Sequence, residues 1–158
     1  IVLIPEREEL WFGIIGSGAW CENRLGTKKK ISFSERTEIN DLILVSSKNH
    51  QQLELLKLLS SFSFAETKKI GSVGCKVASI LRGESDVYIS LSGKTSPKDW
   101  DMAAPLAIIE GAGGYFTDIK GRKLDFLKDS YDQGGILIAS MNSNHYEICK
   151  EISNIVNT

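Results

Sequence analysis

The chain has 158 residues, about the length of one domain. Of these, 42% are hydrophobic and 25% are charged, which is typical of a globular protein and excludes a disordered acidic tail. Nineteen lysines and arginines against twenty aspartates and glutamates leave a net charge of −1. This balance argues against a general nucleic-acid binder, which needs a basic surface.

The cysteines and the apolar runs indicate the compartment. Cys21, Cys75 and Cys149 lie far apart and form no metal-binding spacing, so we expect reduced thiols in a cytoplasmic protein. No apolar run approaches the roughly 20 residues of a membrane span, and no signal peptide is apparent. Because the chain begins with Ile1 inside an apolar run, we expect it to be a piece of a longer protein.

The first third of the chain has a β pattern. Apolar runs at 1–4 and 10–15, joined by a polar segment, predict a β-hairpin. A third short segment follows at 19–25, and the basic run at 28–30 is typical of a solvated loop. The continuous apolar run at 42–45 then predicts a buried strand.

Helices and strands alternate after that strand. Asn49 is a candidate N-cap for a helix that carries leucines at three-residue steps. The elements expected next are a loop over 62–69 leading into a short strand, a helix over 71–83, a strand over 86–91, a helix over 100–112, strands over 115–117 and 135–140, and a helix over 142–156. The last helix should bury Ile148, Ile152, Ile155 and Val156.

The helix at 100–112 has two special features. Alanines give it a small-residue face suited to close packing. Pro105 should lie in its first turn, because a proline deeper in a helix costs about 3 kcal/mol, so we expect the helix to start near Asp101.

The order of elements predicts an α/β fold, a layered sandwich of a mixed β-sheet with flanking helices. We expect a hairpin region over 1–35 that leads into an α/β core over 36–158.

Three short segments could carry chemistry. Asp101, at a helix N-terminus, is placed either to cap its helix or to bind a hard cation such as Mg²⁺. The segment Gly71-Ser72-Val73-Gly74-Cys75-Lys76 opens a helix with small residues, which fits either an anion site or close packing with an exposed lysine. His50, after the strand at 42–45, is either a ligand contact or a surface residue near a helix start.

All three of these segments resemble a known family. Trp100-Asp101-x-Ala103-Ala104, followed by Glu110-Gly111-Ala112-Gly113-Gly114, resembles the second signature of the inositol monophosphatase superfamily, whose members are Mg²⁺-dependent phosphatases of small phosphorylated metabolites. The segment 71–76 resembles the glycine-rich loop of its 3′(2′),5′-bisphosphate nucleotidase branch, and Ser47-Lys48-Asn49-His50 resembles that branch's S-R-S-H segment.

This resemblance implies the C-terminal part of the sugar-phosphatase fold. It implies that Asp101 is the catalytic Mg²⁺ ligand and that His50, Ser72, Gly74 and Lys76 bind the substrate. The implied reaction removes the 3′-phosphate of 3′-phosphoadenosine 5′-phosphate to give AMP. In the complete enzyme two or more Mg²⁺ ions would activate water and stabilise the leaving oxygen.

The sequence also departs from the family pattern. The first signature, D-P-[IL]-D-G-T, is missing, and the chain has no Asp-Pro dipeptide. One aspartate cannot hold two Mg²⁺ ions against water, so we expect the C-terminal domain of a longer phosphatase, inactive alone and holding Mg²⁺ at most weakly.

The expected partners are a small phosphorylated nucleotide or sugar and the missing N-terminal half, with no nucleic-acid polymer and no membrane. Apolar surface left uncovered by that half predicts self-association. Two alternatives stay open: an inositol-phosphate or fructose-1,6-bisphosphate phosphatase, and a non-catalytic nucleotide-binding domain.

Overall fold

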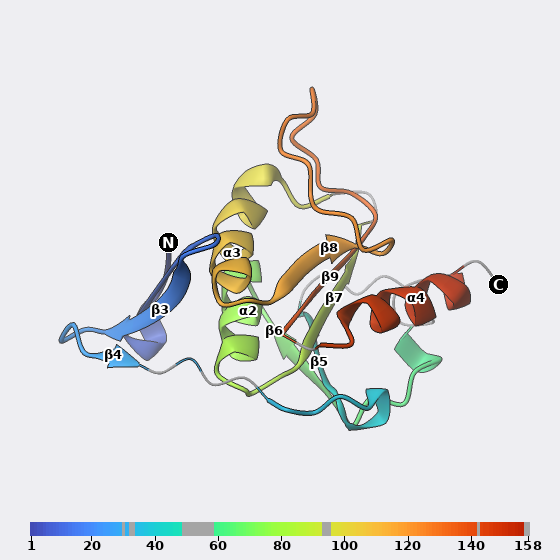
Figure 1. Ribbon diagram of the computed structural model, residues 1–158, viewed down its shortest axis with the longest axis horizontal. Coiled ribbons are helices and arrows are strands. Elements are labelled where there is room, and N and C mark those ends of the chain that lie inside the picture. The colour runs from blue at the N-terminus through green and yellow to red at the C-terminus, as the bar shows by residue number, and fades with distance from the viewer. Residues whose placement is uncertain (30, 32–33, 49–58, 93–95, 142, 157–158) are drawn as a thin grey trace.

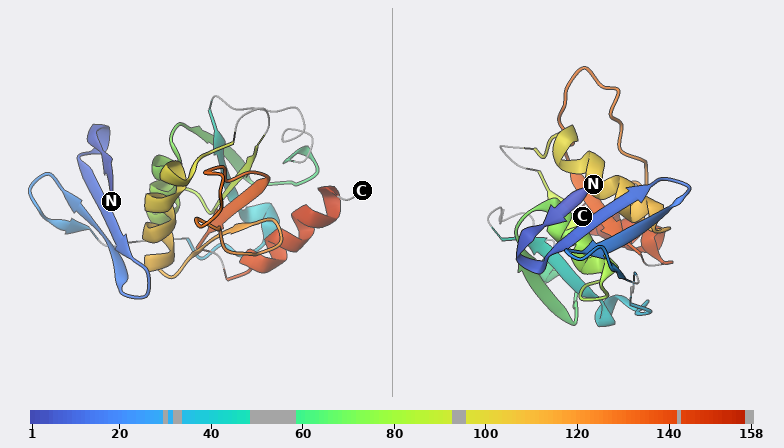
Figure 2. Two further views of the ribbon diagram at one scale, coloured as in Figure 1. Left: turned by 90° about the horizontal axis from the view of Figure 1, so that it is seen from above. Right: turned by 90° about the vertical axis from the view of Figure 1, so that its left-hand side faces the viewer.

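The structure is a computed structural model that describes residues 1–29, 31, 34–48, 59–92, 96–141 and 143–156. Within these ranges the chain forms two β-sheets and the helices α2, α3 and α4 (Figure 1). Helices α2 and α3 lie side by side between the sheets, and α4 covers the opposite face of the larger sheet (Figure 2). The predicted α/β sandwich of a mixed sheet with flanking helices is therefore confirmed.

The smaller sheet contains the N-terminal strands in the order β1-β2-β3-β4, all antiparallel. These strands are β1 (Val2–Ile4), β2 (Glu9–Ile14), β3 (Gly18–Asn23) and β4 (Lys28–Lys29). The predicted hairpin is confirmed, since β1 and β2 pair with Val2 opposite Trp11. The solvated-loop prediction is wrong for the first two lysines of the basic run, because both pair with β3.

The larger sheet is mixed, in the order β6-β5-β7-β9-β8. Its strands are β5 (Ile43–Ser47), β6 (Glu66–Ile70), β7 (Val87–Leu91), β8 (Tyr115–Asp118) and β9 (Ile136–Ser140). Strand β5 runs parallel to β6 and β7, whereas β9 is antiparallel to β7 and β8. Strand β6 begins inside the segment 62–69 that was expected to be a loop, because a polar edge strand is held by backbone pairing and has little apolar pattern.

The helices are α2 (Val73–Leu81), α3 (Asp99–Gly111) and α4 (His145–Val156), close to the predicted ranges. Gly83 follows α2 with a φ of +70°, the left-handed conformation that ends a helix. Val156 was expected to be buried but is 50% exposed, because it lies in the last turn of α4, beyond the sheet-facing Ile152. The helix expected after Asn49 lies outside the described residues.

Pro105 is not in the first turn of α3, contrary to the prediction. The helix begins at Asp99, so Pro105 lies in the second turn and has no N–H to donate to the carbonyl of Asp101. Contacts from outside the helix hold the extra turn. The side-chain amide of Gln133 donates to Asp99 Oδ1 at 2.6 Å, and the Lys98 N–H donates to Asp101 Oδ2 at 2.9 Å.

Close backbone packing joins the smaller sheet to α3. A Cβ on Gly13 of β2 would lie 2.6 Å from the Ala107 carbonyl oxygen and 2.6 Å from Ile108 Cα. A Cβ on Gly111 would lie 2.6 Å from the carbonyl oxygen of Gly18 in β3. Only hydrogen fits at these positions, so the predicted close packing of α3 is present at Ala107 and Ile108, whereas Ala103 of the predicted face is exposed.

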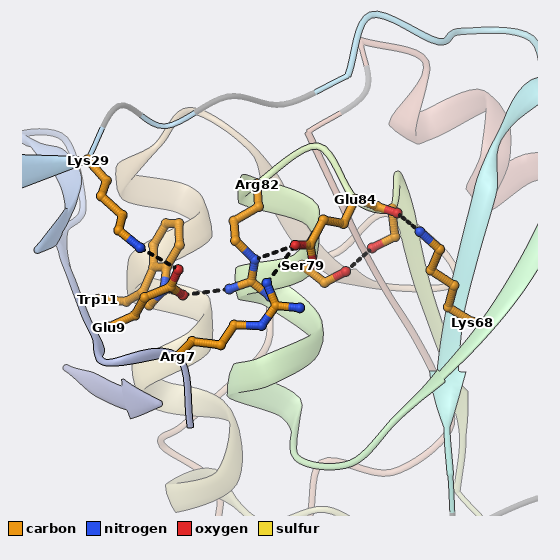
Figure 3. Close-up of polar contacts among 9 residues, drawn as sticks. Arg7, Glu9, Trp11, Lys29, Lys68, Ser79, Arg82 and Glu84 are labelled. Carbon is orange, nitrogen blue, oxygen red and sulfur yellow. Dashed lines mark hydrogen bonds and ion pairs between the residues drawn. The ribbon is translucent and has the colours of Figure 1, made fainter. Parts of the chain in front are cut away.

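A buried carboxylate joins the smaller sheet to the end of α2 (Figure 3). Glu9 is 3% exposed and accepts hydrogen bonds from Trp11 Nε1 at 2.9 Å, Lys29 Nζ at 3.1 Å and Arg82 at 2.7 Å. Burial alone would raise the pKa of Glu9, but these donors and the two cations lower it below its usual value. Arg82 also pairs with Glu84, which pairs with Arg7.

His145 is a buried residue whose role the sequence did not reveal. The Thr117 hydroxyl donates to the Asp118 carbonyl at 2.8 Å, so it accepts from His145 Nε2, also at 2.8 Å. His145 Nδ1 is then the acceptor for the Ser140 hydroxyl at 2.8 Å. Burial lowers the pKa of His145 from 6.5 to about 4, which keeps the ring neutral at pH 7.

The first prediction concerns the contact between β2 and α3. Gly13→Ala forces a methyl group against helix backbone, and overpacking of this kind costs about 1–3 kcal/mol or more. We expect at least about 2 kcal/mol of lost stability, measured by urea unfolding. Gly71→Ala is the matched control, because a Cβ on Gly71 meets nothing within 4 Å. Equal stability of the two variants would contradict the packing argument.

The second prediction follows from the buried imidazole. Because the pKa of His145 is lower in the folded chain than 6.5, the unfolded chain takes up the proton first as the pH falls. Protonation of His145 therefore costs no stability above pH 6.5. Between pH 6.5 and pH 4 it lowers the free energy of unfolding by roughly 3 kcal/mol. Urea unfolding of wild type and His145→Gln across this range should show a flatter pH dependence in the variant. Parallel curves would refute it.

Candidate functional site

A cavity of about 600 Å³ lies between the first turns of α2 and α3. The N-terminal end of α2 contributes Ser72 and Gly74, and the start of α3 contributes Trp100 and Asp101. The carboxyl ends of the parallel strands β5 and β7 and the N-terminal end of the chain also contribute to the lining, with Ser47, Ser90, Leu91, Ile1 and Val2. Ligands of open α/β sheets bind at this edge, so the topology marks the cavity as a candidate ligand site.

Lys76 is a buried cation in the wall of this cavity. The residue is 3% exposed, and its Nζ donates to the Ser72 carbonyl oxygen at 3.3 Å and lies 5.1 Å from the centre of the Tyr88 ring. Burial lowers the pKa of Lys76 to about 8, so the ammonium is protonated at pH 7 but close to losing its proton. The expectation of an exposed lysine is wrong, because the side chain runs back over Tyr88 of β7.

The surroundings of Lys76 favour an anion. A carbonyl oxygen and an aromatic ring are weak partners for a buried ammonium, and in the described part of the chain no carboxylate pairs with it. A phosphate group in the cavity would supply the missing charge and accept hydrogen bonds from the ammonium. The geometry therefore fits an anion-binding site.

Ser72 has an unusual backbone conformation. Its φ of +56° is rare for a residue other than glycine, and its side chain makes no capping hydrogen bond to α2. Strain of this kind gathers at functional sites, where the surrounding fold maintains it. The Ser72 hydroxyl is thus left for the cavity, next to the unpaired N–H groups of the first turn of α2.

Gly74 has a structural reason to be glycine. A Cβ at this position would lie 2.7 Å from Val2 Cγ1 in β1. The close-packing explanation that the sequence left open therefore applies to Gly74, even though the residue also lines the cavity.

Asp101 caps its helix and lines the cavity as well. Its Oδ2 accepts the hydrogen bond from the Lys98 N–H, and its side chain is exposed. The described residues contain no group of three or more His, Cys, Asp or Glu side chains that could hold a metal ion. Asp101 can supply one ligand, but the described residues do not form a complete magnesium site.

Of the residues predicted to bind metal or substrate, Ser72, Gly74, Lys76 and Asp101 line one cavity. His50 lies outside the described residues. Sequence reasoning missed Tyr88, which supports Lys76. Its place inside the predicted strand 86–91 gave no sign of a functional role.

These features define an α/β protein with a candidate anion site, and the family follows from comparison with known proteins. Residues 1–157 match the model of the inositol monophosphatase family, so the chain belongs to that family. The resemblance seen in the sequence is confirmed.

Curated relatives include bisphosphate nucleotidases and a Nus factor. The chain is 26% identical over 106 residues to mouse 3′(2′),5′-bisphosphate nucleotidase 1, covering 66% of this chain and 34% of the relative. It is 40% identical over 77 residues to the 3′,5′-bisphosphate nucleotidase AHL of Arabidopsis thaliana, covering 46% and 21%. It is 27% identical over 146 residues to the Nus factor SuhB of Xylella fastidiosa, covering 88% and 50%. The chain therefore spans half or less of these relatives.

Solved structures show the same fold. An inositol monophosphatase from Anabaena superposes with a TM-score of 0.72 at 22% identity, over 96% of this chain and 57% of the other. A Ca-bound IMPase family protein from Staphylococcus aureus superposes with a TM-score of 0.70 at 24% identity, over 97% and 54%. In the described part of the chain, no helix has the length and apolar character needed to cross a bilayer.

The third prediction concerns the cost of burying Lys76. Its pKa is lower in the folded chain than the usual 10.5, so the unfolded chain holds the proton more tightly and stability is lost as the pH falls from 10.5 to 8. Lys76→Met removes this cost at pH 7, and we expect a gain of about 1–3 kcal/mol in urea unfolding. The gain should shrink toward pH 10.5.

Lys69→Met is the matched control, since Lys69 is exposed on β6 and its replacement should change stability by less than about 0.5 kcal/mol. A Lys76→Met protein that is less stable than wild type at pH 7 would show that the ammonium is a structural group.

Proposed function

We propose that this chain is the substrate-binding part of a phosphatase that removes the 3′-phosphate of 3′-phosphoadenosine 5′-phosphate, giving AMP and phosphate. The observation that carries the proposal is Lys76, a buried ammonium without a carboxylate partner among the described residues, in a cavity that Asp101 also lines. The bisphosphate nucleotidases among the relatives support the substrate class.

In this proposal the residues divide the work. Lys76 and the Ser72 hydroxyl bind a phosphate group at the first turn of α2, where the helix dipole also favours negative charge. Asp101 provides one oxygen ligand for Mg²⁺, which would activate the attacking water in the complete enzyme.

The remaining acidic ligands would come from a part of the enzyme outside these 158 residues, which would make this chain the C-terminal domain of a longer phosphatase. The share of the relatives' length that it covers, 34% and 50% in two cases, is consistent with such a division. The chain alone would then bind the phosphate of the substrate without cleaving it.

Two expectations from the sequence, on location and on self-association, accompany this proposal. A cytoplasmic location agrees with the three free thiols. Self-association through exposed apolar side chains of the smaller sheet, such as Leu3 at 63% and Ile14 at 60% exposure, also stays a prediction.

The fourth prediction tests phosphate binding and turnover together. Calorimetric titration with inorganic phosphate should show binding at pH 7 to 8 that weakens above pH 8, as the ammonium of Lys76 loses its proton. In Lys76→Met the affinity should fall by at least about tenfold, since a charge-assisted hydrogen bond is worth about 1.5–3 kcal/mol. With Mg²⁺ and 3′-phosphoadenosine 5′-phosphate, the chain alone should release no phosphate.

The same measurements identify the ways in which the proposal fails. Equal phosphate affinity in wild type and Lys76→Met would exclude Lys76 as the anion site. Phosphate release by the chain alone would disprove the division of metal ligands. Lys69→Met should behave as wild type throughout.

A further inference from the structure

Trp100 is an exposed aromatic side chain on the rim of the cavity. It lines the cavity but is 67% exposed, and it packs against Tyr131, which is 63% exposed. The two ring centres lie 5.7 Å apart, with the ring planes tilted by 45°. The neighbouring cavity carries the ammonium of Lys76 in its wall.

Tyr131 is held in this position by a docked loop. The segment between β8 and β9 projects beyond the start of α3 and returns along it (Figure 1). The Asp99 N–H donates to the Tyr131 carbonyl oxygen at 2.9 Å, and Lys98 Nζ pairs with Asp132 at 2.5 Å. Gln133 is 3% exposed, and its N–H donates to the Pro97 carbonyl oxygen at 2.8 Å.

These bonds hold the backbone of both aromatic residues, Trp100 and Tyr131, in place without a ligand. The loop is fixed to the start of α3 at Tyr131 and at the next two residues, Asp132 and Gln133, and Trp100 lies in the first turn of that helix. An ordered aromatic surface loses little conformational entropy on binding, which favours affinity.

The chemistry of the cavity favours one class of ligand. A ligand that contacts both Lys76 and Trp100 needs an anionic group for the ammonium and a flat ring for the indole. A nucleotide has both, whereas a phosphorylated polyol has no aromatic ring to stack. The volume of about 600 Å³ suits a ligand of nucleotide size.

The other aromatic groups do not serve this purpose. Of the aromatic residues that line the cavity in the described part of the chain, Tyr88 is 3% exposed and is already occupied by Lys76. The stacked pair Phe12 and Trp20 belongs to the smaller sheet and does not line the cavity.

We infer that Trp100, supported by Tyr131, is a stacking surface for the base of a nucleotide whose phosphate lies at Lys76. The inference rests on the proposed function and extends it, because it assigns a base-binding subsite within the cavity. Trp100 is then a base-binding residue, and the docked loop positions it through Tyr131.

The fifth prediction compares ligands with and without a base. Adenosine 3′,5′-bisphosphate and ribose 5-phosphate are titrated by calorimetry into wild type, Trp100→Ala and Trp100→Phe. Stacking contributes about 1–3 kcal/mol per base, so Trp100→Ala should bind adenosine 3′,5′-bisphosphate about 5-fold to 150-fold more weakly. Its affinity for ribose 5-phosphate should stay within about twofold, and Trp100→Phe should recover most of the loss.

Leu127→Ala is the matched control, because Leu127 is 95% exposed on the same loop and carries no ring. This variant should bind both ligands as wild type does. Thermal unfolding of each variant shows that it is folded before titration.

The outcomes separate this inference from the proposed function. If wild type binds both ligands through Lys76 but Trp100→Ala changes neither affinity, or lowers both equally, the base subsite is refuted and the phosphate site stands. If wild type binds neither ligand, the proposed function itself fails.

Discussion

The backbone contact between β2 and α3 is the constraint on which the rest of the molecule depends. At Gly13 of β2 and Gly111 of α3 the smaller sheet and the helix approach so closely that a methyl group would meet backbone atoms at 2.6 Å. Val2 makes a similar contact with Gly74 at the start of α2. The smaller sheet therefore contacts the C-terminal half of α3 and the first turn of α2, and so fixes the two helices relative to each other. The cavity between the helices inherits its shape from contacts that leave no room for adjustment.

Two buried charges on opposite sides of α2 show how structural and functional groups differ. Glu9 is surrounded by Trp11, Lys29 and Arg82, so its charge is satisfied and its pKa stays low. Lys76 has only a carbonyl oxygen and the Tyr88 ring, and burial lowers its pKa to about 8. A charge that the fold satisfies stabilises the fold. A charge that the described residues leave without a counterion destabilises it and is suited to binding a ligand anion.

Local pattern predicted the elements well, because apolar periodicity and glycine stops are properties of short segments. Local pattern failed where residues distant in the sequence determine the secondary structure. Lys28 and Lys29 read as a loop because their strand partner is not visible in local sequence. Pro105 lies deeper in α3 than predicted, since Gln133 from another loop holds the extra turn. The site segments were recognised by family resemblance, which cannot show that Lys76 is buried or that Tyr131 is docked beside Trp100.

Asp101 shows that capping and metal binding need not exclude each other. The cap uses Oδ2, which accepts from Lys98, so among the described residues the second carboxylate oxygen is left for a ligand. A hard cation needs several oxygen ligands, and the described residues offer no such cluster. Anion binding at Lys76 needs none of them, because burial and the α2 terminus act without a metal. In the proposed function, phosphate binding at Lys76 and metal-assisted hydrolysis are therefore physically separable, and the described residues would carry out the first.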